Sequence, residues 1–225
     1  MSIGTLRENS LHAALKAYYA RPSDEIEAKL DGYYIDVRRG DTLLEIQTGS
    51  FSHIKRKLTK LLDEYLVLLI YPIPYEKWIV RISEENEPIS RRKSPKRGQP
   101  VDAFRELLRI PHLLPHPNLT VELVLTREEQ VLRDDGKGSW RRKRWSVYDR
   151  RLLDVVKQVR LASTTDYLAL LPPLDEPFTN KELANALRIR PNLARKITYT
   201  LTKVGWLEEV GKRRRAKLFK RASIS

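Results

Sequence analysis

Two acidic residues, Asp36 and Glu45, are separated by eight residues that have the pattern of a β-hairpin. With a two-residue turn at Arg39-Gly40, Asp36 would face Leu43 on the next strand. Because side chains alternate along a strand, Asp36, Glu45 and Gln47 would then share one face. Two neighbouring carboxylates repel each other unless a proton or a cation lies between them. The pair therefore predicts a divalent-cation site.

The elements around this hairpin must hold it against a core. Its opposite face is apolar and consists of Ile35, Val37, Leu44 and Ile46. Apolar periodicity and turn residues predict the neighbouring elements. They are a helix over 8–19, a strand over 25–30 joined to the hairpin by the turn Asp31-Gly32, a helix over 51–65, a buried strand over 66–71 and a strand over 78–82.

The spacing of Asp, eight residues, then Glu-x-Gln, together with this order of elements, resembles the PD-(D/E)xK nuclease superfamily over residues 5–82. The resemblance implies an α/β fold with an αβββαβ restriction-endonuclease-like core and a mixed sheet. It also implies a metal-dependent DNA endonuclease that binds Mg2+ or Mn2+ through Asp36 and Glu45. Gln47 stands where Lys is usual and cannot take up a proton. The alternative is a catalytically inactive, nuclease-like DNA-binding regulator or accessory subunit.

Three further residues are candidates for the same site. Glu8 would lie in the first helix, where the superfamily often has another acidic residue, although the helix dipole alone favours Glu at that position. Lys55 and Lys57 follow the site strand and could reach back to a phosphate. The simpler interpretation of both lysines is a solvated basic helix face.

The composition favours a polyanionic partner. The formal net charge is +14, and 41% of the residues are hydrophobic, which is enough for a folded core. Double-stranded DNA is the leading candidate, because neutralising phosphates releases counterions. There is no Cys, no signal-like N-terminus and no apolar run long enough to span a bilayer. We expect a cytoplasmic, nucleoid-associated protein without a membrane partner.

The middle segment, residues 83–149, extends the nuclease-like core of residues 1–82. Residues 83–100 have no apolar period and are rich in Arg and Lys, which indicates a loop. Arg91, Arg92 and Lys93 would form a phosphate-contacting arm, or else part of a solvated linker. A short helix over 101–109 and a strand over 119–133 follow.

Residues 150–225 are predicted to form a separate DNA-binding domain. Helices are expected over 148–159 and 165–171, then after a capping box from Thr179 to Glu182, and again from Pro191 to about Val204. Two strands with a basic loop follow Gly205. This order resembles the winged helix-turn-helix family, which implies duplex DNA as the ligand. The residues expected to contact DNA are Arg195, Lys196, Tyr199 and Lys203 on the outer helix face and Arg213, Arg214 and Arg215 in the loop.

A homodimer is a further alternative, because many nucleases of this type dimerise to cut both strands. The sequence has no heptad repeat or exposed apolar stripe that would establish a dimer. The number of copies is therefore left open.

Overall fold

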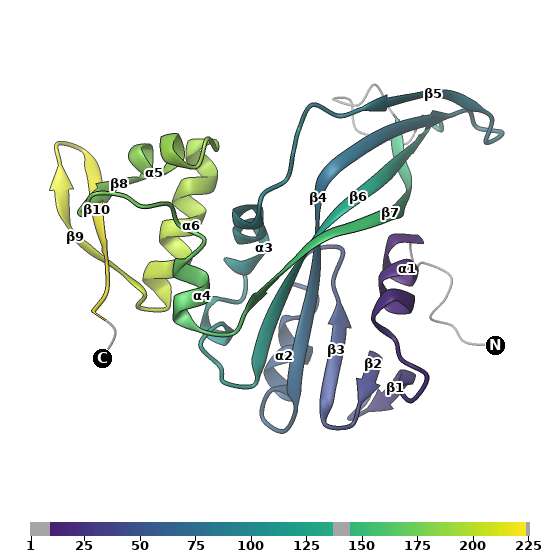
Figure 1. Ribbon diagram of the computed structural model, residues 1–225, viewed down its shortest axis with the longest axis horizontal. Coiled ribbons are helices and arrows are strands. Elements are labelled where there is room, and N and C mark those ends of the chain that lie inside the picture. The colour runs from purple at the N-terminus through teal and green to yellow at the C-terminus, as the bar shows by residue number, and fades with distance from the viewer. Residues whose placement is uncertain (1–9, 137–144, 224–225) are drawn as a thin grey trace. The chain divides into compact units, whose positions relative to one another are not determined.

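The computed structural model describes residues 10–136 and 145–223 of the 225-residue chain (Figure 1). The first half contains α1 (Ser10–Tyr19), β1 (Glu25–Leu30), β2 (Tyr33–Arg39), β3 (Thr42–Ile46), α2 (Lys55–Leu61), β4 (Leu66–Ile82), β5 (Pro88–Lys93), η2 (Pro100–Ala103), α3 (Phe104–Leu107) and η3 (Pro111–Leu113). The second half contains β6 (Leu119–Arg133), β7 (Ser146–Leu161), α4 (Thr164–Leu168), β8 (Phe178–Thr179), α5 (Asn180–Ala186), α6 (Pro191–Lys203), β9 (Leu207–Arg213) and β10 (Ala216–Arg221).

The chain divides into two compact units. The first comprises residues up to 48, residues 70–99 and residues 123–159, and the second comprises residues 49–69, 100–122 and 160–225. None of the helices in the described parts of the chain combines the length and the apolar character needed to cross a membrane.

A seven-stranded mixed sheet dominates the fold. Its strands lie in the order β1-β2-β3-β4-β6-β7, and β5 pairs with β4 in addition. The predicted α/β class with a mixed sheet is confirmed. The elements also begin in the predicted order, which is α1, β1, β2, β3, α2 and β4.

The β2–β3 hairpin keeps the predicted faces but not the predicted register. The turn lies at Gly40-Asp41 instead of Arg39-Gly40, and Gly40 takes a left-handed φ of 55°. Val37 consequently pairs with Leu44, which shifts the register by two residues from the predicted one. Because a shift of two preserves the face of each side chain, the apolar face is buried as expected.

Three other predictions about single segments are wrong. The strands expected over 66–71 and 78–82 form one strand, β4, which runs through two prolines. Part of the loop expected over 83–100 is the strand β5, which pairs with β4 between Trp78 and Ile82. The helix expected over 148–159 is the strand β7 at the edge of the sheet. Apolar doublets gave this segment a helical spacing, but its valines and its pairing with β6 favour a strand.

The module from α4 to β10 has a small sheet of its own, with the strand order β8-β10-β9. Thr179 and Glu182 form the predicted capping box at the start of α5, and Pro191 is the first residue of α6. The inner face of α6 is buried, including Leu193, Ile197 and Leu201. Gly205 ends the helix with a φ of 76°, a conformation that glycine adopts without strain.

Candidate carboxylate site and nucleic-acid interface

Asp36 and Glu45 come from the two strands of the β2–β3 hairpin. The observed pairs run from Arg39 with Thr42 to Val37 with Leu44, and one further step in this register sets Asp36 opposite Glu45. Residues that pair across antiparallel strands point to the same side of a sheet. The two carboxylates therefore lie on the same face, as predicted. They are directly opposite each other, whereas the predicted register set Asp36 opposite Leu43. Glu45 is 3% exposed.

Both oxygens of the Asp36 carboxylate have polar partners. Its Oδ2 accepts a hydrogen bond from the backbone N–H of Ile46 at 2.7 Å, and its Oδ1 lies 3.0 Å from Nε2 of His12. His12 is on α1, which contacts β2 and β3. The sequence prediction missed His12, although its position next to the inward-facing Leu11 was a usable signal. The imidazole and the Ile46 N–H thus fix the orientation of the Asp36 carboxylate.

A second polar pair lies at the end of β3. Arg150 on β7 donates from Nη2 to both oxygens of Glu128 on β6, at 3.1 and 2.9 Å, and from Nη1 to the carbonyl of Thr48 at 3.2 Å. The Glu128 side chain is only 1% exposed. Sequence reasoning missed this pair, because Arg150 lies in the segment that was predicted to be a helix and Glu128 is 22 residues away in the chain. Arg150 therefore connects β6, β7 and the segment that follows the predicted site strand.

The donor chemistry of the carboxylate pair suits a hard divalent cation, since carboxylate oxygens are the ligands that Mg2+ and Mn2+ prefer. The described residues contain no group of three or more His, Asp or Glu side chains arranged to hold a metal ion. Water molecules would have to supply the remaining ligands. Glu8, the predicted third carboxylate, lies outside the described residues.

The other predicted catalytic residues lie on separate elements. Gln47 follows β3, and its backbone N–H donates to the carbonyl of Ile70 on β4 at 2.9 Å. Lys55 and Lys57 lie on α2, which belongs to the second unit, and Lys55 is exposed. The proposed reach of these lysines to a phosphate stays a prediction.

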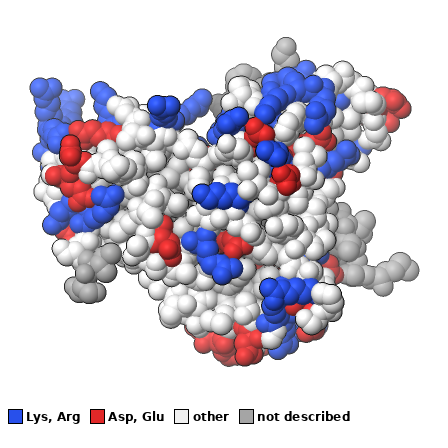
Figure 2. Space-filling view, viewed as in Figure 1, with Lys and Arg blue, Asp and Glu red and all other residues white. Residues whose placement is uncertain are grey.

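A cavity of about 790 Å3 lies between α6 and the β9–β10 hairpin. Five positively charged residues line it: Lys181, Arg195, Lys203, Arg215 and Lys217. Glu209 is the acidic residue of the lining, and Lys217 donates to it at 2.7 Å. Figure 2 shows Lys and Arg side chains gathered over the hairpin, with acidic side chains beside them. Positively charged side chains therefore outnumber acidic ones in the lining of the cavity.

The outer face of α6 carries the residues that were predicted to contact DNA. Arg195, Tyr199 and Lys203 are exposed and line the cavity, whereas Lys196 is half-buried. Tyr199 is 51% exposed, which is high for an aromatic side chain on a packed helix. This helix thus presents two cations and one aromatic ring to the same open space.

The three hairpin arginines have different surroundings. Arg213 donates to Oε1 of Glu182 at 2.7 Å and to the carbonyl of Pro177 at 3.4 Å. The hydrogen bond from the Thr179 N–H, assisted by Arg213, holds the pKa of Glu182 below its ordinary value. Arg214 forms the turn with a left-handed φ of 56°, and Arg215 lines the cavity. Among the described residues, Arg213 therefore has structural contacts, with Glu182 and Pro177, that Arg214 and Arg215 lack.

The predicted arm residues Arg91, Arg92 and Lys93 lie on β5, where all six residues are exposed. Arg91 pairs with Val80, Arg92 with Ile79 and Lys93 with Trp78. Because side chains alternate along a strand, Arg92 points to the opposite face from the other two. The three consecutive cations cannot form one contact surface. Arg91 and Lys93 flank Trp78, with their charged groups 5.2 and 5.1 Å from the ring centre.

Comparison with known proteins gives a family but no activity. A family model described as "Domain of unknown function (DUF8091)" matches residues 9–162. The chain is also similar to a protein of Treponema pallidum (strain Nichols) named "Uncharacterized protein". The two are 34% identical over 186 residues, which cover 82% of this chain and 74% of the Treponema protein. No solved structure matches the chain.

Proposed function

The chain belongs to the family of the domain of unknown function DUF8091, and we propose that it binds duplex DNA through α6 and the β9–β10 hairpin. The observation that carries this proposal is the cavity of about 790 Å3 between these elements, which five cations and one acidic residue line. Cations at that density attract the phosphate backbone whatever the base sequence. The excess of positive charge in the whole chain, +14, supports the same partner.

The order of elements in this module supports the proposal. Helix α4, strand β8, helices α5 and α6 and the β9–β10 hairpin follow the order of a winged helix-turn-helix domain, and the sheet order is β8-β10-β9. In that family the last helix enters the major groove, while the hairpin contacts the backbone or the minor groove. Arg195 and Lys203 would contact DNA from the helix, and Arg214 and Arg215 from the hairpin.

The test is a binding titration with duplex DNA at several salt concentrations. We expect Arg195→Ala/Lys203→Ala to weaken binding roughly tenfold and to lower the slope of log K against log salt by about two, one for each lost phosphate contact. Arg56→Ala/Lys60→Ala removes two cations from α2 in the same unit and should bind like wild type. Unchanged binding by the α6 variant would refute the proposal.

Metal-dependent endonuclease activity is a second candidate function of the same protein. The observation that favours it is the register of the β2–β3 hairpin. In this register, the pair that follows Val37 and Leu44 is Asp36 and Glu45. The element order α1, β1, β2, β3, α2, β4 resembles the core of the PD-(D/E)xK nucleases. Asp36 and Glu45 would hold Mg2+ or Mn2+, and the ion would lower the pKa of a water molecule and shield the charge of the phosphate. Gln47 can orient a water molecule but cannot accept its proton.

Plasmid cleavage separates this candidate from a regulator that only binds DNA. With Mg2+ or Mn2+, we expect wild type to nick plasmid DNA, and Asp36→Ala and Glu45→Ala to lose cleavage while they keep DNA affinity. Glu84→Ala, which changes an exposed acidic residue between β4 and β5, is the matched control and should still cut. If wild type cuts with neither metal, the catalytically inactive DNA-binding regulator is favoured instead.

A further inference from the structure

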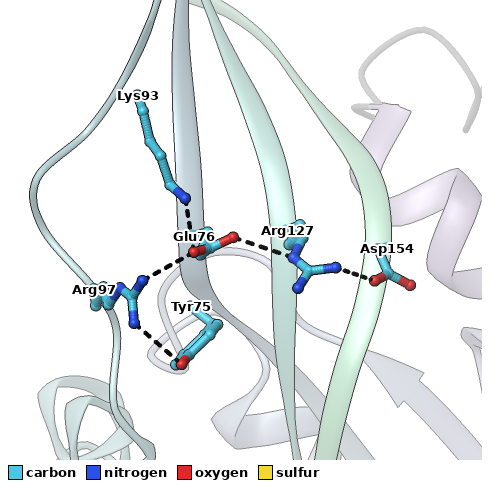
Figure 3. A network of polar contacts seen from close by, with 6 residues as sticks. All are labelled: Tyr75, Glu76, Lys93, Arg97, Arg127 and Asp154. Carbon is cyan, nitrogen blue, oxygen red and sulfur yellow. Dashed lines mark hydrogen bonds and ion pairs between the residues drawn. The ribbon is translucent and has the colours of Figure 1, made fainter.

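Three positively charged side chains converge on one carboxylate in the first unit (Figure 3). Glu76 of β4 accepts hydrogen bonds from Nζ of Lys93 at 2.8 Å, from Nη2 of Arg97 at 3.2 Å and from Nε of Arg127 at 3.1 Å. Arg127 also donates from Nη1 to Asp154 of β7 at 2.9 Å. The cluster thus joins β4, β5, β6, β7 and the segment after β5, which are far apart in sequence.

The carboxylate is covered, and the cations are not. The Glu76 side chain is 11% exposed, whereas Lys93, Arg97 and Arg127 are 49%, 60% and 44% exposed. The hydrogen bond from Lys93, assisted by Arg127, holds the pKa of Glu76 below its ordinary value, so Glu76 stays ionised at neutral pH. Two negative charges, on Glu76 and Asp154, face three positive charges. Because Asp154 is 51% exposed, the three cations and one carboxylate reach the solvent, and the outer surface of the cluster has a net positive charge.

Aromatic rings restrict two of the three cations, Arg97 and Lys93. The guanidinium of Arg97 lies 5.3 Å from the ring centre of Tyr75, and its Nη1 is 3.4 Å from the Tyr75 hydroxyl. Lys93 lies over Trp78. Cation–π contacts of this kind orient flexible side chains before any ligand is present. Binding a ligand at Arg97 and Lys93 therefore costs less side-chain entropy than binding at unrestrained side chains would.

The simplest alternative is an ion-pair network that only joins strands. A single cation paired with one carboxylate would suffice to join two strands, and surface ion pairs contribute little to stability. An arginine has five N–H donors. In the described part of the chain, Arg97 uses donors only on Glu76 and Tyr75, and Arg127 only on Glu76 and Asp154. Donors remain for an anion on the solvent side.

We propose that Lys93, Arg97 and Arg127 form a second binding surface for the phosphodiester backbone of a nucleic acid, and that Glu76 positions them. The nature of the ligand rests on the DNA-binding function proposed above, but the surface lies in the other unit and on different residues. Figure 2 shows Lys and Arg side chains gathered over β5 as well. Arg127 adds to this surface a cation that no local sequence pattern indicated.

The test uses the full-length protein and the variant Arg97→Ala/Arg127→Ala, which leaves Glu76 paired with Lys93. Duplex DNA and a single-stranded oligonucleotide are titrated separately at several salt concentrations. We expect roughly tenfold weaker binding of at least one ligand and a salt slope lower by about two. Loss on both ligands indicates a general backbone contact, and loss on one identifies the preferred strand form. Unchanged affinity and slope for both ligands overturn the proposal.

Two controls separate charge, structure and site. Lys29→Ala/Lys157→Ala removes two cations from exposed strand positions outside the cluster and should bind like wild type. Arg97→Lys/Arg127→Lys keeps both charges and should regain most of the affinity. A loss that the lysine variant does not restore, or that the control shares, overturns the proposal. The variant Arg195→Ala/Lys203→Ala tests the DNA-binding function separately, because any DNA affinity that it loses is lost with Arg97 and Arg127 still in place.

Discussion

Arg150 contacts both carboxylate oxygens of Glu128 with a single nitrogen, at 3.1 and 2.9 Å, across the neighbouring strands β7 and β6. The Glu128 side chain is 1% exposed and the Arg150 side chain 21%. The second terminal nitrogen of Arg150 donates to the carbonyl of Thr48, next to Gln47. A buried carboxylate thus holds the arginine that ties the edge of the sheet to the predicted site strand.

Loss of Arg150 should be costly, because it would leave the Glu128 carboxylate buried without its charge partner. We expect Arg150→Ala to lower the free energy of unfolding by about 3 kcal/mol. Arg151→Ala is the neighbouring control, since that side chain is 54% exposed, and its cost should stay below about 1 kcal/mol. Urea denaturation measures both values. Equal effects of the two variants would contradict a structural role for the pair.

Divalent cations should stabilise the protein if Asp36 and Glu45 bind them. A ligand that binds only the folded state raises the unfolding temperature, and the rise grows with the ligand concentration relative to its Kd. We expect millimolar Mn2+ to raise the unfolding temperature of wild type and of Glu84→Ala, but not of Asp36→Ala or Glu45→Ala. Differential scanning fluorimetry gives this result without an activity assay. An equal rise in the Asp36 variant would exclude Asp36 as a ligand.

The hairpin arginines should separate into stability and binding roles. Because Arg213 donates to Glu182, Arg213→Ala should lower the free energy of unfolding by about 0.5 kcal/mol, typical of an exposed ion pair. Its effect on DNA affinity should be small. Arg214→Ala/Arg215→Ala should instead weaken DNA binding roughly tenfold and leave stability unchanged. Thermal unfolding and DNA titration of both variants check these two roles. Weaker DNA binding by the Arg213 variant, with unchanged binding by the Arg214/Arg215 variant, would disprove them.

The capping box at the start of α5 should contribute to the stability of the second unit. The Thr179 hydroxyl accepts from the Glu182 N–H at 3.2 Å, and the Glu182 carboxylate accepts from the Thr179 N–H at 2.7 Å. Thr179→Ala should cost about 1 kcal/mol, the usual value for loss of an N-cap side chain. Thr165→Ala changes an exposed threonine in the first turn of α4 and should cost much less. Chemical denaturation of the two variants measures the difference.

Acid should destabilise the first unit through Asp24. Arg39 donates to both Asp24 oxygens, at 3.0 and 2.7 Å, and holds the pKa of Asp24 below its ordinary value. The pKa of Asp24 is lower in the folded than in the unfolded protein. The ion pair therefore stabilises the fold fully above the unfolded-state pKa, and this stabilisation is lost as the pH falls toward the folded-state pKa. Between about pH 5 and about pH 2 the free energy of unfolding should fall more steeply for wild type than for Asp24→Asn. Parallel curves would show that the pair contributes nothing.

Local chemistry made several elements predictable from the sequence. The turn Asp31-Gly32 has positive φ at both residues, as such a dipeptide favours, and the capping box and Pro191 start α5 and α6 where expected. Each of these signals acts within a few residues. The apolar periods of the β2–β3 hairpin likewise determined which side chains are buried, and a register error of two residues did not change the faces.

The amino-acid sequence by itself determined the α/β class, the apolar face of the β2–β3 hairpin and the outer face of α6, because these depend on alternation and spacing along one segment. Only the tertiary structure decided that residues 148–159 pair as a strand and not a helix. It also brought His12 to Asp36, Arg150 to Glu128 and Arg127 to Glu76. Those contacts join residues from 22 to 51 positions apart and from different strands or helices. Strand pairing and packing set such distances, so no pattern within one segment encodes them.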